Sequence, residues 1–272
     1  MRITQFTDPM CTWCWGSEPV VRHLRAVYGE RLDVEYVMGG LVEDFETFSD
    51  PANDVSEPGD VAPHWLEASE VHGMPVDVSV FDENPARSTY PASVAFVAAR
   101  QQAPDRAHRY LRRLREAYVT RARNVNERDE QLALAAAVGL DVDAFAAALD
   151  DGSAREGFEA DLSRTREAGV TTFPTYRVEG PDGSRRASGF RSFDDLVEAI
   201  SAVAPALERS SPPPIRRFLV EYGPVATQEV AETYDLDRGK ARQVLRSLAG
   251  EGAAFGEERA TGWFWYATGG DD

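Results

Sequence analysis

The sequence predicts an α/β domain that carries a long helical insertion and is followed by a small domain of helices and a hairpin. Three observations support this prediction: a strand, a helix and a second strand open the chain, a long middle part has helical periodicity alone, and a proline-rich linker precedes the last part. The chain has 272 residues, of which 43% are hydrophobic. It can therefore bury a sizeable core without covalent cross-links.

The first part of the chain has the pattern of a βαβ unit. Residues 2–6 alternate polar and apolar side chains, as a half-buried strand does. Residues 11–28 carry apolar side chains at helical spacing, and residues 32–38 form a second apolar run that ends at Gly39 and Gly40. We expect a right-handed crossover between the two strands.

The middle of the chain shows no second βαβ pattern. Residues 42–62 are rich in Pro, Asp and Ser and predict a loop. We therefore expect a helical insertion over about residues 42–168. Its helices are expected near residues 62–72, 88–102, 105–122, 127–138, 142–150 and 153–168.

Strand character resumes after the insertion. Residues 175–178 and 185–188 are two short strands on either side of a Gly-Pro-Asp-Gly turn (180–183), which predicts an antiparallel hairpin. Residues 193–203 have the pattern of a helix. These elements complete a first domain over residues 1–208.

A second domain follows the linker at residues 209–214, whose prolines make it stiff and extended. The pattern places this domain at residues 215–268. Its elements are three helices and then two strands, at residues 215–222, 227–234, 238–250, 253–255 and 263–266. Three short helices followed by a hairpin resemble a winged helix-turn-helix.

The composition is strongly acidic. There are 46 acidic and 29 basic residues, a formal net charge of −17, and Lys240 is the single lysine. Such a surface disfavours non-specific contact with nucleic acid or anionic lipid, and it is typical of salt-adapted proteins, although an ordinary acidic protein is the alternative. No run approaches the roughly 18 apolar residues of a membrane span, and the first residues lack the pattern of a signal peptide. We expect a cytoplasmic protein without membrane contact.

Two cysteines, Cys11 and Cys14, are the strongest candidates for chemistry. A structural disulfide is not expected in a reducing compartment, so the pair is predicted to be reactive. The spacing places both thiols in the first turn of a helix, where free N–H groups and the helix dipole stabilise a thiolate. We expect Cys11 to be the exposed nucleophile and Cys14 to resolve a mixed disulfide.

Two other interpretations of the pair remain. A zinc site needs two more ligands, and the four histidines are scattered along the chain, at His23, His64, His72 and His108. Two inert buried thiols are the other alternative. We expect neither a metal nor a cofactor.

The segment from Asp8 to Gly16, Asp-Pro-Met-Cys-Thr-Trp-Cys-Trp-Gly, resembles the active-site segment of the DsbA family of thioredoxin-like proteins. It is most similar to the cytosolic FrnE-like members and the related protease-adaptor proteins. Pro19 lies where thioredoxin has a helix-bending proline, so we expect the first helix to bend after its first turns. The resemblance implies a thioredoxin fold.

A second resemblance lies at residues 169–175, Gly-Val-Thr-Thr-Phe-Pro-Thr. In thioredoxin-fold proteins such a segment carries a cis-proline that faces the CxxC pair. The resemblance implies that Pro174 keeps a backbone N–H out of the site and that the backbone beside Phe173 pairs with an extended substrate. An ordinary proline at the start of a strand is the alternative, because most X–Pro bonds are trans.

The resemblance carried by these two segments covers residues 1 to about 205, with two departures from the family pattern. Thr12 and Trp13 replace the Pro-His pair of the strongly oxidising members, and Phe190-Arg191 stands where FrnE-like relatives often have Gly-Ala-Gln. These departures concern the redox potential, because the residues between the cysteines tune thiolate stability.

Four further residues near the pair have open roles. Trp13 and Trp15 form an apolar rim for a substrate or pack against the insertion, and the sequence favours neither. Asp8 and Glu18 are close enough in sequence to accept protons, but a solvated face is the expected role.

In the second domain, Arg238, Arg242 and Arg246 recur every four residues on the third predicted helix, with Lys240 nearby. A recognition helix for DNA has such a stripe. The net charge of residues 212–272 is −3, from 7 basic and 10 acidic side chains, which weakens phosphate contact. Protein docking or a structural role is therefore favoured over DNA binding.

Together these features predict a thiol–disulfide oxidoreductase that acts on protein or small-molecule disulfides and is reset by a cellular redox partner. The alternative is a redox-responsive adaptor or regulator that binds a protein or DNA through its second domain. A glutathione-dependent isomerase or kappa-type transferase is disfavoured, because those relatives usually carry a single serine or cysteine. The direction of the redox chemistry and the oligomeric state stay open.

Overall fold

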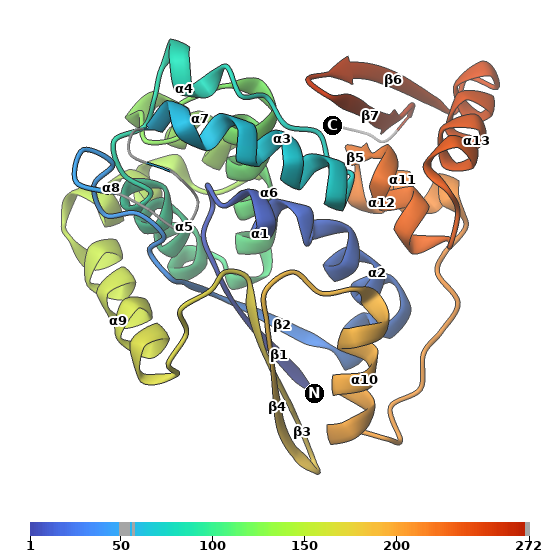
Figure 1. The fold of residues 1–272 in the computed structure, drawn as a ribbon, viewed down its shortest axis with the longest axis horizontal. Coiled ribbons are helices and arrows are strands. Elements are labelled where there is room, and N and C mark those ends of the chain that lie inside the picture. Colours follow the sequence, from blue (N-terminus) through green and yellow to red (C-terminus); the bar gives the residue numbers. More distant parts are fainter. Residues whose placement is uncertain (49–54, 56–57, 270–272) are drawn as a thin grey trace.

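A four-stranded mixed sheet forms the centre of the first part of the chain, in the order β2-β1-β3-β4. In the computed structural model, which describes residues 1–48, 55 and 58–269, the strands are β1 (Arg2–Thr7), β2 (Asp33–Met38), β3 (Thr175–Gly180) and β4 (Gly183–Ser188). β1 pairs parallel with β2 and antiparallel with β3, and β3 pairs antiparallel with β4. The thioredoxin fold expected from the sequence is confirmed (Figure 1).

The helix after β1 is divided into α1 (Thr12–Gly16) and α2 (Glu18–Tyr28). Pro19 lies in the first turn of α2, where its missing N–H removes no helical hydrogen bond. The sequence predicts one helix that bends after its first turns, and the structure places a break at Ser17. A short 3-10 helix, η1 (Gly29–Arg31), then leads into β2.

Two helices cover one face of the sheet. α2 and α10 (Phe193–Val203) pack together, and α10 also packs on β3 and β4. Ile3, Leu24, Val178 and Leu196 are fully buried in the cluster between them. On the opposite face, Phe6 of β1 packs in a separate small cluster. The alternation along β1 thus places Ile3 toward the helices and Phe6 away from them.

The insertion between β2 and β3 is helical, as the sequence predicts. Its helices are α3 (Val61–His72), α4 (Val80–Glu83), α5 (Tyr90–Gln102), α6 (Pro104–Arg121), α7 (Arg128–Ala137), α8 (Val142–Asp150) and α9 (Ser153–Glu167), and the short 3-10 helix η3 (Pro58–Asp60) precedes them. The short helix α4 has no counterpart in the prediction. The predicted loop at residues 42–62 lies partly outside the described residues. No helix in the described part of the chain is long and apolar enough to cross a membrane.

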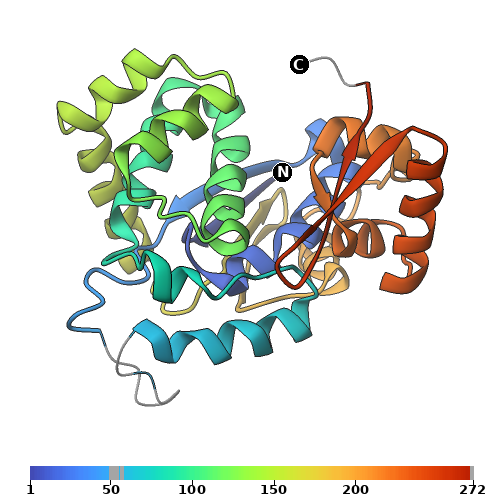
Figure 2. The same ribbon diagram turned by 90° about the horizontal axis from the view of Figure 1, so that it is seen from above.

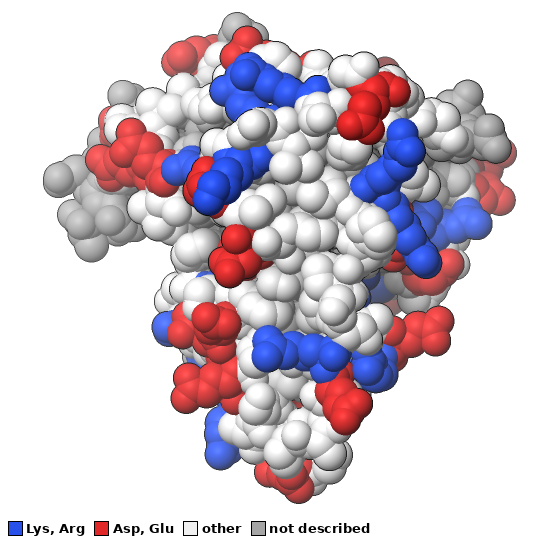
Figure 3. Space-filling view, turned by 90° about the vertical axis from the view of Figure 1, so that its right-hand side faces the viewer, with Lys and Arg blue, Asp and Glu red and all other residues white. Residues whose placement is uncertain are grey.

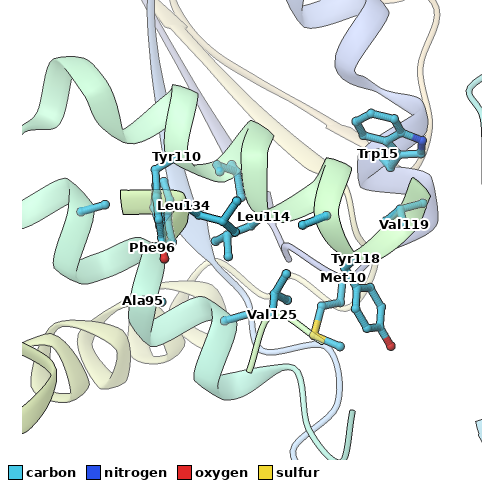
Figure 4. Close-up of a cluster of buried hydrophobic side chains, with 14 of the residues drawn as sticks. Met10, Trp15, Ala95, Phe96, Tyr110, Leu114, Tyr118, Val119, Val125 and Leu134 are labelled. Carbon is cyan, nitrogen blue, oxygen red and sulfur yellow. The ribbon is translucent and has the colours of Figure 1, made fainter. Parts of the chain in front are cut away.

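The core of the insertion continues into the segment that carries the cysteines. α5 packs against both α6 and α9, and several of its alanines, Ala95 among them, are fully buried. Figure 4 shows Met10 and Trp15 in the same apolar cluster as Leu114 and Tyr118 of α6. The insertion therefore directly supports the segment that carries the cysteines.

The last part of the chain, called the C-terminal segment below, has its own core. It contains α11 (Ile215–Tyr222), β5 (Val225–Ala226), α12 (Thr227–Thr233), α13 (Arg238–Gly250), β6 (Ala254–Arg259) and β7 (Gly262–Ala267), with a sheet in the order β5-β7-β6. Phe218, Val230, Leu245 and Trp265 are fully buried in this core. The three helices and the hairpin agree with the prediction, and β5 is an addition to it.

The C-terminal segment packs against α2, the helix that follows the two cysteines. α12 lies along α2, and Figure 2 shows this segment on the opposite side of the N-terminal elements from most insertion helices. It also contacts the insertion: Val76 N donates to Thr261 Oγ1 at 3.0 Å, and Ser69 Oγ lies 3.3 Å from the same oxygen. Both parts of the chain thus meet beside the cysteines.

Candidate dithiol site

Cys11 caps the N-terminus of α1. Its Sγ accepts a hydrogen bond from the backbone N–H of Cys14 at 3.3 Å, and its thiol lies 3.9 Å from the carbonyl oxygen of Phe173. The side chain was expected to be exposed, and this is wrong, because Cys11 is only 5% exposed. Burial raises the pKa of the Cys11 thiol, and the neighbouring Cys14 raises it further, while the Cys14 N–H acts in the opposite direction.

Cys14 lies deeper and is fully buried. Burial opposes ionisation of its thiol, yet its pKa is lowered, because the Cys11 thiol, the Arg115 guanidinium and the Thr7 hydroxyl all favour the thiolate. The helix N-terminus was expected to make Cys11 the anion. In this dithiol form the surroundings favour a negative charge on Cys14 instead.

The charge near Cys14 comes from the insertion. Arg115 of α6 is 1% exposed, and its guanidinium donates to Thr7 Oγ1 and to the carboxylate of Glu18. Burial opposes ionisation of Glu18, but Arg115, Arg112 and Arg22 outweigh it and lower the pKa of that carboxyl. The expected solvated role of Glu18 is wrong, because its carboxylate is buried and paired with Arg115 and Arg112 of α6.

Asp8 shapes the loop before the pair. Its carboxylate accepts from Met10 N and Leu41 N, both at 2.9 Å, and from the Thr89 hydroxyl at 2.8 Å. Asp8 is fully buried, so its expected place on a solvated face is also wrong. Burial raises its pKa against the effect of these donors. The residue ties the cysteine loop to the start of α5, which is a structural role.

Pro174 follows a cis peptide bond from Phe173, as the family resemblance implies. The Thr175 hydroxyl donates to the Thr172 carbonyl at 2.7 Å and fixes the turn. The Phe173 ring lies against Gly39 so closely that a Cβ on Gly39 would lie 2.0 Å from a ring carbon. A glycine at the end of β2 is therefore what allows this segment to lie beside Cys11.

An apolar hollow of about 470 Å³ opens beside Cys11. Its wall is formed by segments far apart in sequence, and Met10, Trp65, Phe81, Tyr118 and Phe173 contribute large apolar surfaces. Three exposed apolar residues, Trp13, Leu41 and Val71, also line it. The sulfur of Cys11 thus lies in the wall of a site that fits an apolar side chain.

The two tryptophans of the motif have different surroundings. Trp13 is 37% exposed, with its ring 6.0 Å from His72 and 5.8 Å from Phe190. Trp15 is fully buried, and its indole N–H donates to the Pro75 carbonyl at 2.8 Å. Of the two roles left open by the sequence, the rim fits Trp13 and packing against the insertion fits Trp15.

His72 of α3 contacts Thr12 and Trp13, the two residues between the cysteines, and is neutral, because burial lowers its pKa to about 4. Its Nδ1 accepts from Met74 N at 3.0 Å, and its Nε2 lies 3.5 Å from the Thr12 hydroxyl. A Cβ on Gly16 would overlap the His72 ring, so the ring packs tightly against α1. Among the described residues, no three His, Cys, Asp or Glu side chains are placed to hold a metal ion.

Sequence reasoning missed Arg115 and His72 as parts of the site. Arg115 had a signal: it lies on the same stripe of α6 as Leu111, Leu114 and Tyr118, at positions i, i+3, i+4 and i+7. A charged residue on an apolar stripe is expected to be paired when buried. His72 had no such signal, because only the tertiary contact with Thr12 distinguishes it from the other histidines.

The predicted basic stripe on α13 is only partly available at the surface. Arg238 and Arg246 are exposed, whereas the Arg242 guanidinium lies 4.9 Å from the centre of the Trp263 ring. On the face shown in Figure 3, basic and acidic groups alternate around a broad uncharged area. This face lacks the continuous positive charge that favours phosphate contact.

Comparison with protein families gives a match to the thioredoxin model over residues 5–185. Among curated proteins, the ClpXP adapter protein SpxH of Shouchella clausii is 33% identical over 257 residues, which cover 91% of this chain and 82% of the relative. The match therefore includes most of the C-terminal segment.

Solved structures with a similar fold cover the first part of the chain. A putative protein disulfide isomerase from Nitrosomonas europaea matches with a TM-score of 0.64 and 22% identity, over 74% of this chain and 95% of that one. The cytosolic disulfide reductase DsbM from Pseudomonas aeruginosa matches with a TM-score of 0.57 and 23% identity, over 74% and 93% of the two chains. At these identities the likeness concerns the fold.

Proposed function

The chain belongs to the thioredoxin family, with a DsbA-like fold, and on that premise we propose that Cys11 and Cys14 exchange disulfides with a protein partner bound beside them. One observation carries the proposal. The Cys11 sulfur lies at the N-terminus of α1, in the wall of an apolar hollow, and 3.9 Å from the Phe173 carbonyl before the cis-proline.

The exchange has two steps. The proton of the Cys11 thiol first passes to the Cys14 thiolate, and the resulting Cys11 thiolate attacks one sulfur of the partner's disulfide and forms a mixed disulfide. The other sulfur leaves as a thiolate and takes up the proton from Cys14. The Cys14 thiolate then attacks Cys11 Sγ, which forms the Cys11–Cys14 disulfide and releases the second sulfur of the partner. Two electrons pass to the partner, and the proton of the Cys11 thiol ends on a released sulfur. A cellular dithiol restores the pair, and the reverse sequence oxidises a dithiol partner.

The substrate class follows from the surroundings of Cys11. An extended segment with an apolar side chain next to its cysteine fits the hollow, and Trp13 at the rim can cover that side chain. The backbone beside Phe173 offers groups for pairing with the segment, because Pro174 has no N–H of its own. Small-molecule disulfides such as oxidised glutathione are an alternative substrate.

A trapping experiment tests this function. The Cys14→Ser protein is mixed with oxidised glutathione and with two disulfide-bonded peptides, one with Phe and one with Asp beside the cysteine. We expect a stable mixed disulfide through Cys11, found by mass spectrometry and formed faster with the Phe peptide. The Cys11→Ser protein is the matched control. Absence of any mixed disulfide with all three probes would falsify the function.

An adaptor is the second candidate, and the SpxH relative favours it because that match includes most of the C-terminal segment. In this function the hollow and the C-terminal segment bind a protein and present it to a protease, and the thiols respond to redox conditions without turning over substrate. The three helices and hairpin of the segment support our proposal that residues 215–268 form a winged-helix domain used for protein contact. We assign the protein to the cytosol, as with DsbM.

The two candidates differ in what they require of the cysteines. A double variant, Cys11→Ser with Cys14→Ser, removes exchange while leaving the hollow and the C-terminal segment in place. Degradation by a ClpXP protease of a candidate partner, with and without the chain, measures the adaptor activity. Unchanged stimulation by the double variant supports the adaptor, and no stimulation by either protein excludes it for that partner.

A further inference from the structure

A chain of buried ion pairs begins at Arg115 and ends in the C-terminal segment. The guanidinium of Arg115, whose charge favours the Cys14 thiolate, contacts the Glu18 carboxylate. Glu18 Oε2 lies 3.5 Å from Arg112 Nη1. Arg112 in turn forms a bidentate pair with Glu229, at 2.7 Å and 2.9 Å. The four charged side chains are at most 8% exposed.

The four residues of this chain of ion pairs come from three different parts of the fold. Glu18 opens the active-site helix α2, Arg112 and Arg115 lie on α6 of the insertion, and Glu229 lies on α12 of the C-terminal segment. Because the charges alternate and are buried, a change at one end is screened less than it would be at the surface.

Glu229 is held in a fixed position. Its Oε2 accepts from the backbone N–H of Ala226 at 2.6 Å, and its Oε1 lies 2.9 Å from Arg22 Nε. Arg22 donates further to the Tyr222 carbonyl at 2.7 Å and so ties α2 to the end of α11. Glu229 therefore cannot turn toward solvent without breaking the contact between the C-terminal segment and α2.

An apolar contact runs beside the ion pairs. Trp15 follows Cys14 directly in the chain, and its ring lies 4.5 Å from the Arg112 guanidinium carbon. Trp15 also stacks with Phe264 of β7, at 6.3 Å between ring centres. The residue after the second cysteine thus contacts the insertion through Arg112 and the C-terminal segment through Phe264.

We propose that this chain of ion pairs couples the oxidation state of Cys11 and Cys14 to the docking of the C-terminal segment. Glu229 is the positioning residue at the far end and acts through Arg112, Glu18 and Arg115. The proposal rests on the disulfide exchange proposed above.

The coupling follows from charge balance. When the pair transfers two electrons to a partner disulfide, the Cys11–Cys14 bond forms, and the negative charge of the thiolate leaves with the partner's sulfurs. Arg115 then has Glu18 as its remaining anion, so Glu18 interacts less with Arg112. Arg112 then depends more on its other two carboxylates, Glu229 and Glu116. Linkage requires the reverse effect to be equal: a change at Glu229 alters the equilibrium between dithiol and disulfide.

The sign of that effect depends on which charge is removed. Loss of the negative charge at Glu229 leaves the chain of ion pairs more positive, which stabilises the Cys14 thiolate and favours the dithiol. Loss of the positive charge at Arg22 favours the disulfide. Both changes break the same Arg22–Glu229 ion pair, so loosening of the segment alone moves the equilibrium in one direction for both.

The test compares full-length wild type, Glu229→Gln and Arg22→Gln in glutathione redox buffers, with the dithiol fraction measured by thiol alkylation and mass spectrometry. We expect the equilibrium constant to move at least threefold toward the dithiol in Glu229→Gln, which corresponds to about 15 mV, and toward the disulfide in Arg22→Gln. The matched control is Glu232→Gln on the same helix, whose carboxylate lies 3.7 Å from His23 and outside the chain of ion pairs. We expect it to resemble wild type.

Two outcomes overturn the coupling. One is the same equilibrium constant in all four proteins, which leaves disulfide exchange intact, and the other is a shift in the same direction in both Gln variants. If no protein forms the Cys11–Cys14 disulfide in any buffer, disulfide exchange itself is rejected, and the coupling with it. If Glu229→Gln does not fold, Arg22→Gln is compared with Arg22→Lys. A shift in the Lys variant, which keeps the charge, as large as in the Gln variant contradicts the electrostatic origin.

Discussion

The two cysteines of one short motif lie against two different regions of the molecule. Cys11 borders an apolar hollow lined by aromatic side chains, whereas Cys14 lies near Arg115 and the buried charges beyond it. Cys11 and Cys14, three positions apart in the sequence, therefore lie in surroundings that suit two different tasks. The apolar region is suited to choosing what approaches Cys11, and the charged region is suited to setting how readily Cys14 gives up its electrons.

The largest expected effect is a loss of stability when the charge of Arg115 is removed from the charged region. Arg115→Met removes the cation beside Cys14 and leaves Glu18 with a weaker set of partners, so we expect a loss of about 3–5 kcal/mol in the free energy of unfolding. Denaturant unfolding measures it. Arg109→Met, an exposed residue of the same helix, is the control and is expected to change stability by less than about 0.5 kcal/mol. Equal losses in the two variants would contradict a stabilising pairing of Arg115 with Glu18.

The sequence alone predicts the local features of these two regions, but not the partners that lie far away in the chain. The cysteine pair, the strand before it and the segment before Pro174 are local patterns, and they predicted the fold and the two ends of the site. Glu18 is different. Its position in the first turn of a helix is equally compatible with solvent, and its actual partner, Arg115, lies 97 positions later in the chain.

The hollow beside Cys11 escaped prediction for a related reason. Its wall combines residues such as Leu41, Trp65, Phe81 and Tyr118, which lie on separate elements. Periodicity identifies each of these as an apolar residue of its own helix or loop, but not the space that they enclose together. The exposure expected for Cys11 failed because this wall, and not the helix terminus alone, determines what covers the sulfur.

The next effect concerns the apolar region. Gly39→Ala places a methyl group against the Phe173 ring, which must move away from Cys11, so we expect a loss of about 1–3 kcal/mol together with slower mixed-disulfide formation. Gly59→Ala is the control, because its Cβ would meet nothing within 4 Å. Unfolding curves and peptide-disulfide kinetics measure the two effects. A rate as fast as that of wild type would contradict the role of the Phe173 segment beside Cys11.

A smaller effect appears as pH dependence in the charged region. The pKa of Glu18 is held below its ordinary value of 4.5, so its contribution to stability is present above that pH and is lost as the pH falls through the lowered pKa. The difference in unfolding free energy between wild type and Glu18→Gln should therefore shrink on acidification, by about 1.4 kcal/mol for each unit by which the pKa is lowered. Urea unfolding between pH 3 and 7 measures it. Glu30→Gln, exposed on η1, should show no such trend, and a constant difference for Glu18→Gln would contradict the pairing.

The smallest expected effect separates the two regions most cleanly. Trp13 lies at the rim of the hollow and is 37% exposed, so Trp13→Ala should change stability little while removing apolar surface that covers a bound side chain. We expect about threefold slower exchange with a Phe-containing peptide disulfide, which corresponds to about 0.6 kcal/mol, and no change with an Asp-containing one. Because Trp13 is outside the chain of ion pairs, the glutathione equilibrium of the pair should stay at its wild-type value. A shift in that equilibrium, or equal slowing with both peptides, would mean that the apolar and charged regions do not act separately on the two sulfurs.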